Sequence, residues 1–149
     1  MASVTFKATS RKLPGGLAVE NESRGFKLTM DEPAELGGTD TGMNPVEALL
    51  CALGSCQCIV GAAFAKAKNI SFTELWVETE GDLNPDGFIK GLPDVRRGFE
   101  EIRFKLHIKT DNDEEQIYDF AEFMQERCPV EDNLQNSTPV KALPVEIVR

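Results

Sequence analysis

The spacing of hydrophobic and polar positions predicts both strands and helices in this chain. In the clearest strand, Ile102, Phe104, Leu106 and Ile108 alternate with charged or polar side chains, as in a strand with one buried face. Shorter apolar or β-branched runs bounded by turn residues predict further strands. They cover residues 4–9, 17–21, 26–30 and 72–80, and a last strand flanked by Pro139 and Pro144 ends near Val148.

A long apolar run after residue 43 predicts the main helix. Asn44 suits the N-cap and Pro45 suits the first helical position. Glu47 lies three residues past the cap, where its side chain can accept a hydrogen bond from the backbone N–H of Asn44. We expect the helix to extend to about Lys68, with Asn69 ending it.

A second helix is predicted over residues 113–127, because apolar residues recur there at helical spacing. The residues that share this apolar face are Ile117, Phe120, Ala121, Met124 and Cys128. Pro129 can begin a short further helix with Cys128 at its N-cap. Before the second helix, residues 82–98 are predicted to form a long loop that contains the pair Arg96-Arg97.

The order of these elements predicts an α+β fold. Strands, a helix, strands, a helix and a strand follow one another along a single domain of residues 1–149, which argues against a doubly wound parallel sheet. The main helix has no polar face, and one small sheet does not cover a helix that is apolar all round. We therefore expect a second copy of the chain to cover it in an intimate homodimer.

Charge and composition narrow the classes of partner. The chain has a net charge of -9 and a pI of about 4.7, which disfavours nucleic acid and anionic membrane surfaces as partners. Residues 48–65 carry no charge but include Gly54, Ser55, Gln57 and Gly61, so they predict a helix buried in protein rather than a membrane span. The first twelve residues lack a signal-peptide core, and the cytoplasm is the expected compartment.

The four cysteines are expected to be reduced in that compartment, which favours a redox or metal role over a disulfide scaffold. The spacing of Cys51, Cys56 and Cys58 on one helix matches no zinc or iron–sulfur motif, so no metal site is predicted. Cys51 and Cys58 fit small buried hydrophobic positions. His107, the only histidine, falls on the polar face of its strand and fits a solvated or cross-strand residue.

Cys128 is predicted to lie in a different environment. A thiol at a helix N-terminus has its pKa lowered by the partial positive charge of the helix, and Arg127 adds a cation beside it. Glu126 and Glu131 act in the opposite direction. These residues alone leave a reactive thiol and a merely packed thiol equally open.

Two segments of the chain resemble a known family. The first runs from Gly42-Met43-Asn44-Pro45 to Leu53-Gly54-Ser55-Cys56, and the second is Cys128-Pro129-Val130. Together with Asp31-Glu32-Pro33 and Gly37-Gly38, they resemble the OsmC/Ohr superfamily, the osmotically induced and organic hydroperoxide resistance proteins. The resemblance covers nearly the whole chain, with the elements in the same order.

This resemblance implies both a fold and an activity. Members are intertwined homodimers in which two antiparallel sheets wrap around two central helices, with two sites at the interface. The implied activity is a thiol-dependent peroxidase acting on organic hydroperoxides. By motif position, the thiolate of Cys56 attacks the peroxide and becomes a sulfenic acid, which condenses with Cys128 to a disulfide. An external dithiol reductant reopens the disulfide, and no metal or organic cofactor is implied.

The chain departs from the family at a position that the chemistry uses. In the peroxidase members a glutamate directly follows the Asn-Pro pair and fixes an arginine that holds the thiolate, whereas this chain has Val46 there. Glu47, one residue later, should point away from Cys56 and is better explained as a helix cap. The groups considered for stabilising the thiolate are Glu47, Arg11, Arg24, Arg96 and Arg97, or an arginine of the second subunit.

Two other functions stay open at this point. A binding protein with the same fold would hold a small apolar or sulfur-containing ligand at the dimer interface, and Val46 favours this function. A redox-sensing dimer would be locked by oxidation of Cys56 and Cys128 without turnover. A peroxidase loses both thiols rapidly when peroxide is added, a binding protein does not react, and a sensor oxidises once.

Overall fold

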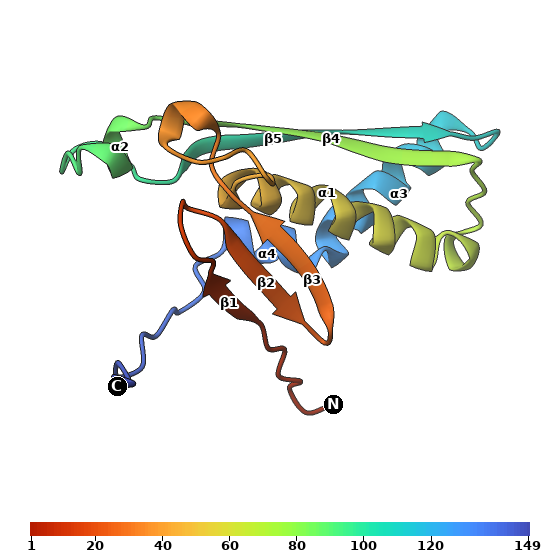
Figure 1. Cartoon of the computed structure of the whole chain (residues 1–149). Helices are drawn as coiled ribbons and strands as arrows, with labels where there is room; N and C mark the ends of the chain where they lie inside the picture. The colour runs from red at the N-terminus through yellow and green to blue at the C-terminus, as the bar shows by residue number, and fades with distance from the viewer. The chain divides into compact units, whose positions relative to one another are not determined.

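The computed structural model describes residues 1–149, which form two compact units, Met1–Cys51 and Ala52–Arg149. Each unit has its own antiparallel sheet, and the helices complete a mixed structure (Figure 1). The predicted α+β class with two antiparallel sheets is therefore confirmed. The assignment of residues 1–149 to a single domain stays a prediction.

The first unit contains a three-stranded sheet. β1 (Thr9–Lys12), β2 (Val19–Ser23) and β3 (Phe26–Met30) pair in chain order, each antiparallel to the next. β3 has the predicted bounds, but the strand predicted over residues 4–9 is wrong. Thr9 pairs with Glu22 and β2 ends at Ser23, so residues 4–7 extend past the end of the partner strand.

A buried carboxylate orders the loop between β3 and the main helix. The side chain of Asp31, 2% exposed, accepts hydrogen bonds from the backbone N–H groups of Glu32, Thr39 and Thr41 and from both threonine hydroxyls. The hydroxyl of Thr39 and these backbone donors hold the pKa of Asp31 well below its usual range. The loop, which includes the turn η1 (Ala34–Leu36), is thus organised around one charged group.

The main helix, α1 (Pro45–Phe64), begins as predicted. The backbone N–H of Asn44 donates to Oε2 of Glu47 at 2.8 Å, and the backbone N–H of Glu47 donates to Oδ1 of Asn44 at 2.9 Å. This reciprocal pair is a capping box. After the turn η2 (Lys66–Lys68), Asn69 adopts a left-handed conformation with φ 56 and ends the helical segment.

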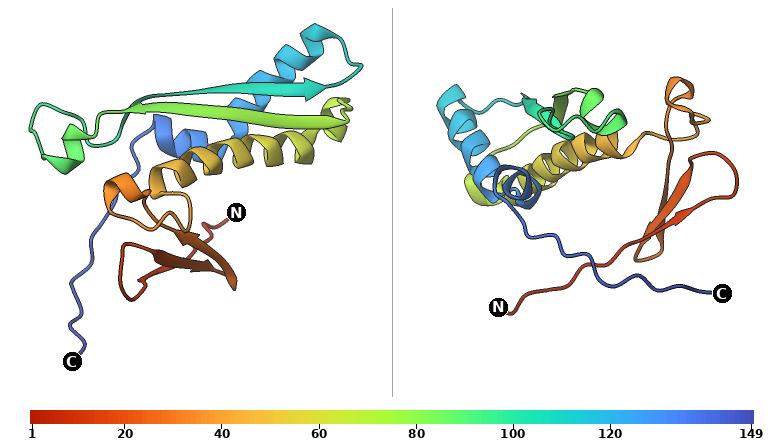
Figure 2. Two further views of the ribbon diagram at one scale, coloured as in Figure 1. Left: turned by 45° about the horizontal axis from the view of Figure 1, so that its top comes forward. Right: turned by 90° about the vertical axis from the view of Figure 1, so that its left-hand side faces the viewer.

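The second unit packs helices against one face of a long hairpin. β4 (Glu74–Leu83) pairs with β5 (Phe99–Lys109), and α1 and α3 (Glu114–Arg127) lie along one face of that pair (Figures 1 and 2). Between the strands, the predicted loop contains the short helix α2 (Asp86–Ile89). The buried core between helices and hairpin consists of Val60, Ala65, Ile70, Phe120 and Met124.

α1 has one buried face and one exposed face. By length and composition alone it is apolar enough to cross a membrane, a test that the core helix of a soluble protein also passes. Leu53, Val60 and Gly61 are buried, whereas Ala52 and Ile59 are exposed, Ile59 at 68%. A single chain therefore leaves part of this apolar helix uncovered.

The C-terminal segment differs from the prediction. α4 (Pro129–Gln135) begins with Cys128 at its N-cap, as expected. The strand predicted near Val148 is wrong, because residues 137–149 are exposed and pair with no strand of the chain. A strand requires a neighbour to satisfy its backbone groups, and without one the apolar side chains stay in solvent, among them Val140, Leu143, Val145 and Ile147.

Candidate functional site

Two helical segments bring Cys56 and Cys128 together. Cys56 lies on α1, and Cys128 lies between α3 and α4 with 1% of its side chain exposed. The two thiols are hydrogen-bonded to each other and both are free. The two thiols are therefore neighbours, which is the arrangement that a disulfide between them requires.

Burial controls the acidity of the Cys128 thiol. The backbone N–H of Glu131 donates to Sγ of Cys128 at 3.4 Å. Burial, as the largest effect, and the adjacent Cys56 thiol nevertheless raise the pKa of the Cys128 thiol to about 11, against the opposite effect of the Glu131 and Val130 backbone groups. The predicted lowering of this pKa is wrong, because the loss of water outweighs the N–H donors.

A buried amide–carboxylate pair joins the same two helices. The side chain of Gln57 is fully buried, and its Nε2 donates to Oε2 of Glu131 at 2.5 Å. Nε2 of Gln135 donates to the other carboxylate oxygen at 2.9 Å. Burial raises the pKa of Glu131, although both amide donors oppose the rise. Sequence reasoning gave Gln57 no site role, yet a glutamine within an apolar helix indicates a specific polar partner.

The other two cysteines lie apart from this contact. Cys51 is exposed, so its predicted burial is wrong, because it lies on a part of α1 that a single chain leaves uncovered. Cys58 is half-buried and in hydrogen-bond contact with the backbone of Val77, and burial raises the pKa of its thiol. No group of three or more histidine, cysteine or acidic side chains is placed to hold a metal ion.

His107 has the cross-strand position that its alternation predicted. Its ring stacks on Trp76 at a centroid distance of 4.7 Å, and Nε2 lies 2.7 Å from Oε2 of Glu78. All three residues belong to the β4–β5 hairpin. The histidine thus supports the strand pair and has no contact with the thiols.

The predicted thiolate-stabilising groups have other contacts. Glu47 is part of the helix cap, and Arg11 and Arg24 belong to the first unit, where the guanidinium of Arg24 lies 5.3 Å from the ring centroid of Phe26. No arginine is among the groups that shift the pKa of the Cys128 thiol. Arg127, the cation next in sequence, lies over the ring of Phe123.

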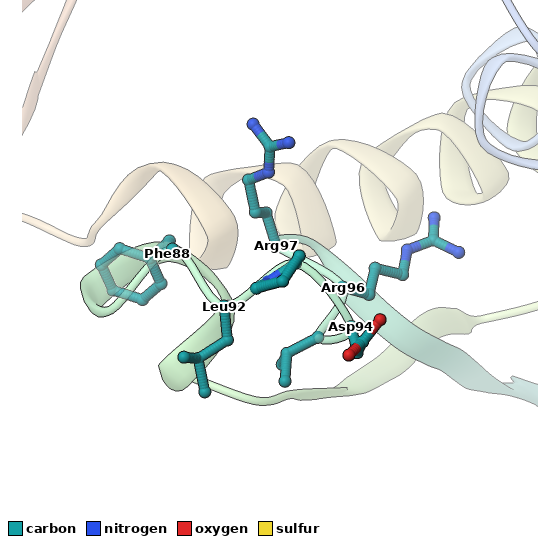
Figure 3. A pocket seen from close by; sticks show the side chains of 9 residues that line it. Phe88, Leu92, Asp94, Arg96 and Arg97 are labelled. Carbon is teal, nitrogen blue, oxygen red and sulfur yellow. The ribbon is translucent and has the colours of Figure 1, made fainter.

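Arg96 and Arg97 line a cavity of about 600 Å³ in the loop between β4 and β5 (Figure 3). Phe88 and Leu92 supply apolar lining and Asp94 supplies a carboxylate. Both arginines are exposed, and their side chains extend in different directions. They form no ion pair with a carboxylate of the chain, so their charge is available to a ligand in this loop.

A model of one protein family matches most of the chain. The family is described as OsmC-like protein, and the match covers residues 38–142. This range includes α1, the hairpin, α3 and α4, and therefore both members of the Cys56–Cys128 contact.

Two curated relatives share the name hydroperoxide reductase. The protein from Mycoplasma genitalium is 30% identical over 123 residues, 80% of this chain and 79% of the relative. The one from Mycoplasma pneumoniae is 31% identical over 119 residues, 78% of this chain and 77% of the relative.

Solved structures show the same fold. An OsmC-like protein from Mycoplasma pneumoniae has a TM-score of 0.79 and 26% identity, with 91% of each chain covered. An organic hydroperoxide resistance protein OsmC from Legionella pneumophila has a TM-score of 0.64 and 22% identity, with 91% of this chain and 92% of that chain covered.

Proposed function

Because the chain belongs to the OsmC-like protein family, we propose that it is a thiol-dependent peroxidase that reduces organic hydroperoxides. The contact between the Cys56 and Cys128 thiols carries this proposal, since a peroxidase of this type needs one thiol to attack and a second within reach. The name of the two curated relatives, hydroperoxide reductase, supports the same chemistry. The reductant is an external dithiol in the cytoplasm, and no metal or organic cofactor takes part.

The reaction proceeds in two steps at the sulfur atoms. The Cys56 thiolate attacks one oxygen of the hydroperoxide, the O–O bond breaks, and the other oxygen leaves as an alcohol after taking a proton. Cys56 is then a sulfenic acid. The sulfur of Cys128 attacks the sulfur of Cys56, the S–O bond breaks, and hydroxide leaves as water with the proton from Cys128. The external dithiol then reduces the disulfide by exchange.

Exposed apolar surface supports a homodimer as the working form. Ile59 and Ala52 lie on the uncovered face of α1, and the exposed Val145 and Ile147 flank Glu146 in a terminal segment that has no strand partner. Both features are costly in water for a single chain. A second copy would cover the helix and supply the missing strand neighbour.

Consumption of an alkyl hydroperoxide in the presence of excess dithiothreitol tests the proposal. The wild-type protein should turn over, Cys56→Ser should be inactive, and Cys128→Ser should complete at most one slow round and accumulate a sulfenic acid. Cys51→Ser, which alters an exposed cysteine away from the contact, is the matched control and should retain turnover. Equal consumption by the wild type and Cys56→Ser would exclude the mechanism.

A redox-sensing dimer is the second candidate, and the electrostatics of the site favour it. Val46 replaces the glutamate of the peroxidase members, and no cation is among the groups that shift the pKa of the Cys128 thiol. Both features disfavour rapid turnover, whereas the neighbouring thiols still allow one oxidation to a disulfide. A sensor would form the Cys56–Cys128 disulfide once and then change its binding properties. It would show a single stoichiometric oxidation without turnover in the same assay.

A further inference from the structure

The hydrogen bond between Gln57 and Glu131 lies beside the contact between the two thiols. Like that contact, it joins α1 to the start of α4. Gln57 follows Cys56 on α1, and Glu131 lies three residues after Cys128 in the first turn of α4. The amide–carboxylate hydrogen bond therefore joins the same two segments as the Cys56–Cys128 contact. A fully buried glutamine is costly unless it is hydrogen-bonded, so this bond constrains where α4 lies on α1.

Glu131 also contacts the resolving thiol directly. Its backbone N–H donates to Sγ of Cys128 at 3.4 Å, while its side chain accepts from Gln57 and Gln135. The side-chain bonds fix the residue whose backbone touches the sulfur. A change at the carboxylate is therefore transmitted to the position and the charge environment of Cys128.

No positive charge compensates the carboxylate of Glu131. It has no partner among the ion pairs of the chain. The backbone N–H of Glu131 contacts the Cys128 thiol, and Glu126 and Asp132 line the same cavity of about 350 Å³ as Glu131. All of these groups are neutral or negative, and burial raises the pKa of Glu131 itself.

Building on the proposed peroxidase chemistry, we propose that Gln57 and Glu131 are a positioning pair for formation of the Cys56–Cys128 disulfide, in which the hydrogen bond holds Cys128 against Cys56 and the ionised carboxylate opposes ionisation of the Cys128 thiol. The pair makes the rate of the second step, the attack of Cys128 on the oxidised Cys56, depend on pH. When Glu131 is protonated its negative charge is absent, and it no longer slows this step. When it is ionised, the proton on Cys128 is harder to remove.

Titration of Cys128 tests the charge effect without peroxide. The background is the full chain with Cys51, Cys56 and Cys58 changed to serine, so that thiolate absorbance reports Cys128 alone. Glu131→Gln keeps an acceptor oxygen for Gln57 and removes the charge, and it should give about tenfold more thiolate at a given pH below the thiol's pKa. Glu126→Gln removes a charge along the same cavity without touching Gln57, and should change the titration much less.

Exchange of the two side chains tests the positioning. In the protein with all four cysteines, Gln57→Glu places a second carboxyl group opposite Glu131. Because the two carboxylates repel each other at neutral pH, this variant should form the disulfide with diamide about tenfold more slowly. Gln57→Glu combined with Glu131→Gln restores one amide and one carboxylate, and should recover most of the rate. A variant that is merely misfolded would not be rescued by a second change.

The outcomes separate this proposal from the proposed function. An unchanged Cys128 titration in Glu131→Gln, or no recovery of the rate in the exchanged pair, overturns the positioning pair. If the titration and the rate recovery are as expected while the wild type consumes no hydroperoxide, the positioning pair is supported and the peroxidase function is excluded. The rate advantage of Glu131→Gln over the wild type should vanish as the pH falls through the pKa of Glu131 in the wild type.

Discussion

The thiol of Cys128 is hydrogen-bonded to the thiol of Cys56, which is carried by a different helix. Core packing produces this contact. Cys128 lies one helical turn after Met124 and Cys56 lies one turn before Val60, and both Met124 and Val60 belong to the buried core. The residues that stabilise the second unit therefore also align the two sulfur atoms.

Close packing of α1 against the core predicts opposite effects for two glycines. A Cβ at Gly61 would lie 2.7 Å from Cδ2 of Leu75 and 2.9 Å from Cε of Met124, whereas a Cβ at Gly54 has no neighbour closer than 3.7 Å. Gly61→Ala should cost about 1–2 kcal/mol of unfolding free energy through overpacking. Gly54→Ala should be neutral or stabilising by up to about 1 kcal/mol, because alanine favours the helix.

Urea unfolding of the two variants beside the wild type measures this difference. The same midpoint for Gly54→Ala and Gly61→Ala would show that α1 does not pack against Leu75 and Met124 as described.

Acid sensitivity of the first unit should depend on Asp31. Its pKa is lower in the folded protein than the usual value of about 3.9, so its stabilising contribution is present above that value and is lost as the pH falls toward the folded pKa. Asp31→Asn should be less stable than the wild type at neutral pH, because the buried amide cannot accept all the hydrogen bonds from Thr39 and Thr41. The difference in unfolding free energy between Asp31→Asn and the wild type should become smaller as the pH falls.

Thermal unfolding at several pH values checks this prediction. A difference between Asp31→Asn and the wild type that stays constant from neutral pH to strong acid would contradict the role of the charged group. Thr29→Ser, a change outside this hydrogen-bond network, serves as the control.

Local chemistry in the sequence was sufficient for α1, α3 and α4 but not for α2 or the end strands. The capping box of Asn44 and Glu47, the helix end at Asn69 and the N-cap at Cys128 were all predicted, because each depends on residues a few positions apart. The first strand was predicted over residues 4–9 but lies at Thr9–Lys12, and the strand predicted near Val148 is absent. A strand depends on a neighbour that the local pattern does not reveal, and in a single chain residues 4–7 and 137–149 have none.

The sequence identified two cysteines that the structure brings together, but it did not predict the electrostatics around them. The two cysteines were identified by the family motif, and the structure brings them into contact. The pKa of Cys128 was predicted with the wrong sign, since burial depends on packing between helices that lie far apart in the sequence. The hydrogen bond between Gln57 and Glu131 was missed for the same reason, because the two residues are 74 positions apart.

Dimer formation should depend on the exposed face of α1. Ile59 is 68% exposed in the single chain, and Ile59→Glu would place a charge where a second copy is expected to pack. Tyr118 is also 68% exposed but lies on the polar face of α3, among Glu114, Glu115 and Glu122. Tyr118→Glu is therefore the matched control.

Sedimentation velocity should show a dimer for the wild type and for Tyr118→Glu, and a monomer or weakened dimer for Ile59→Glu. A folded wild-type monomer at micromolar concentration would contradict the proposed homodimer.

The pH dependence of disulfide formation should reflect the buried Cys128 thiol. Its pKa is raised to about 11, so the thiolate fraction, and with it the rate of the second step, should rise about tenfold per pH unit from pH about 8 to about 10. Rapid quenching and mass measurement of the sulfenic acid would give this rate. A plateau near the ordinary thiol pKa of about 8.5 would show that Cys128 reacts from a solvated state instead.

The most direct test of the central claim is a peptide map of the reduced protein after one equivalent of an alkyl hydroperoxide, with the free thiols blocked at once. The account predicts rapid loss of two thiols, a cross-linked pair of peptides containing Cys56 and Cys128, and intact thiols at Cys51 and Cys58. Four free thiols after prolonged exposure, or a disulfide that joins Cys51 or Cys58 instead, would contradict it.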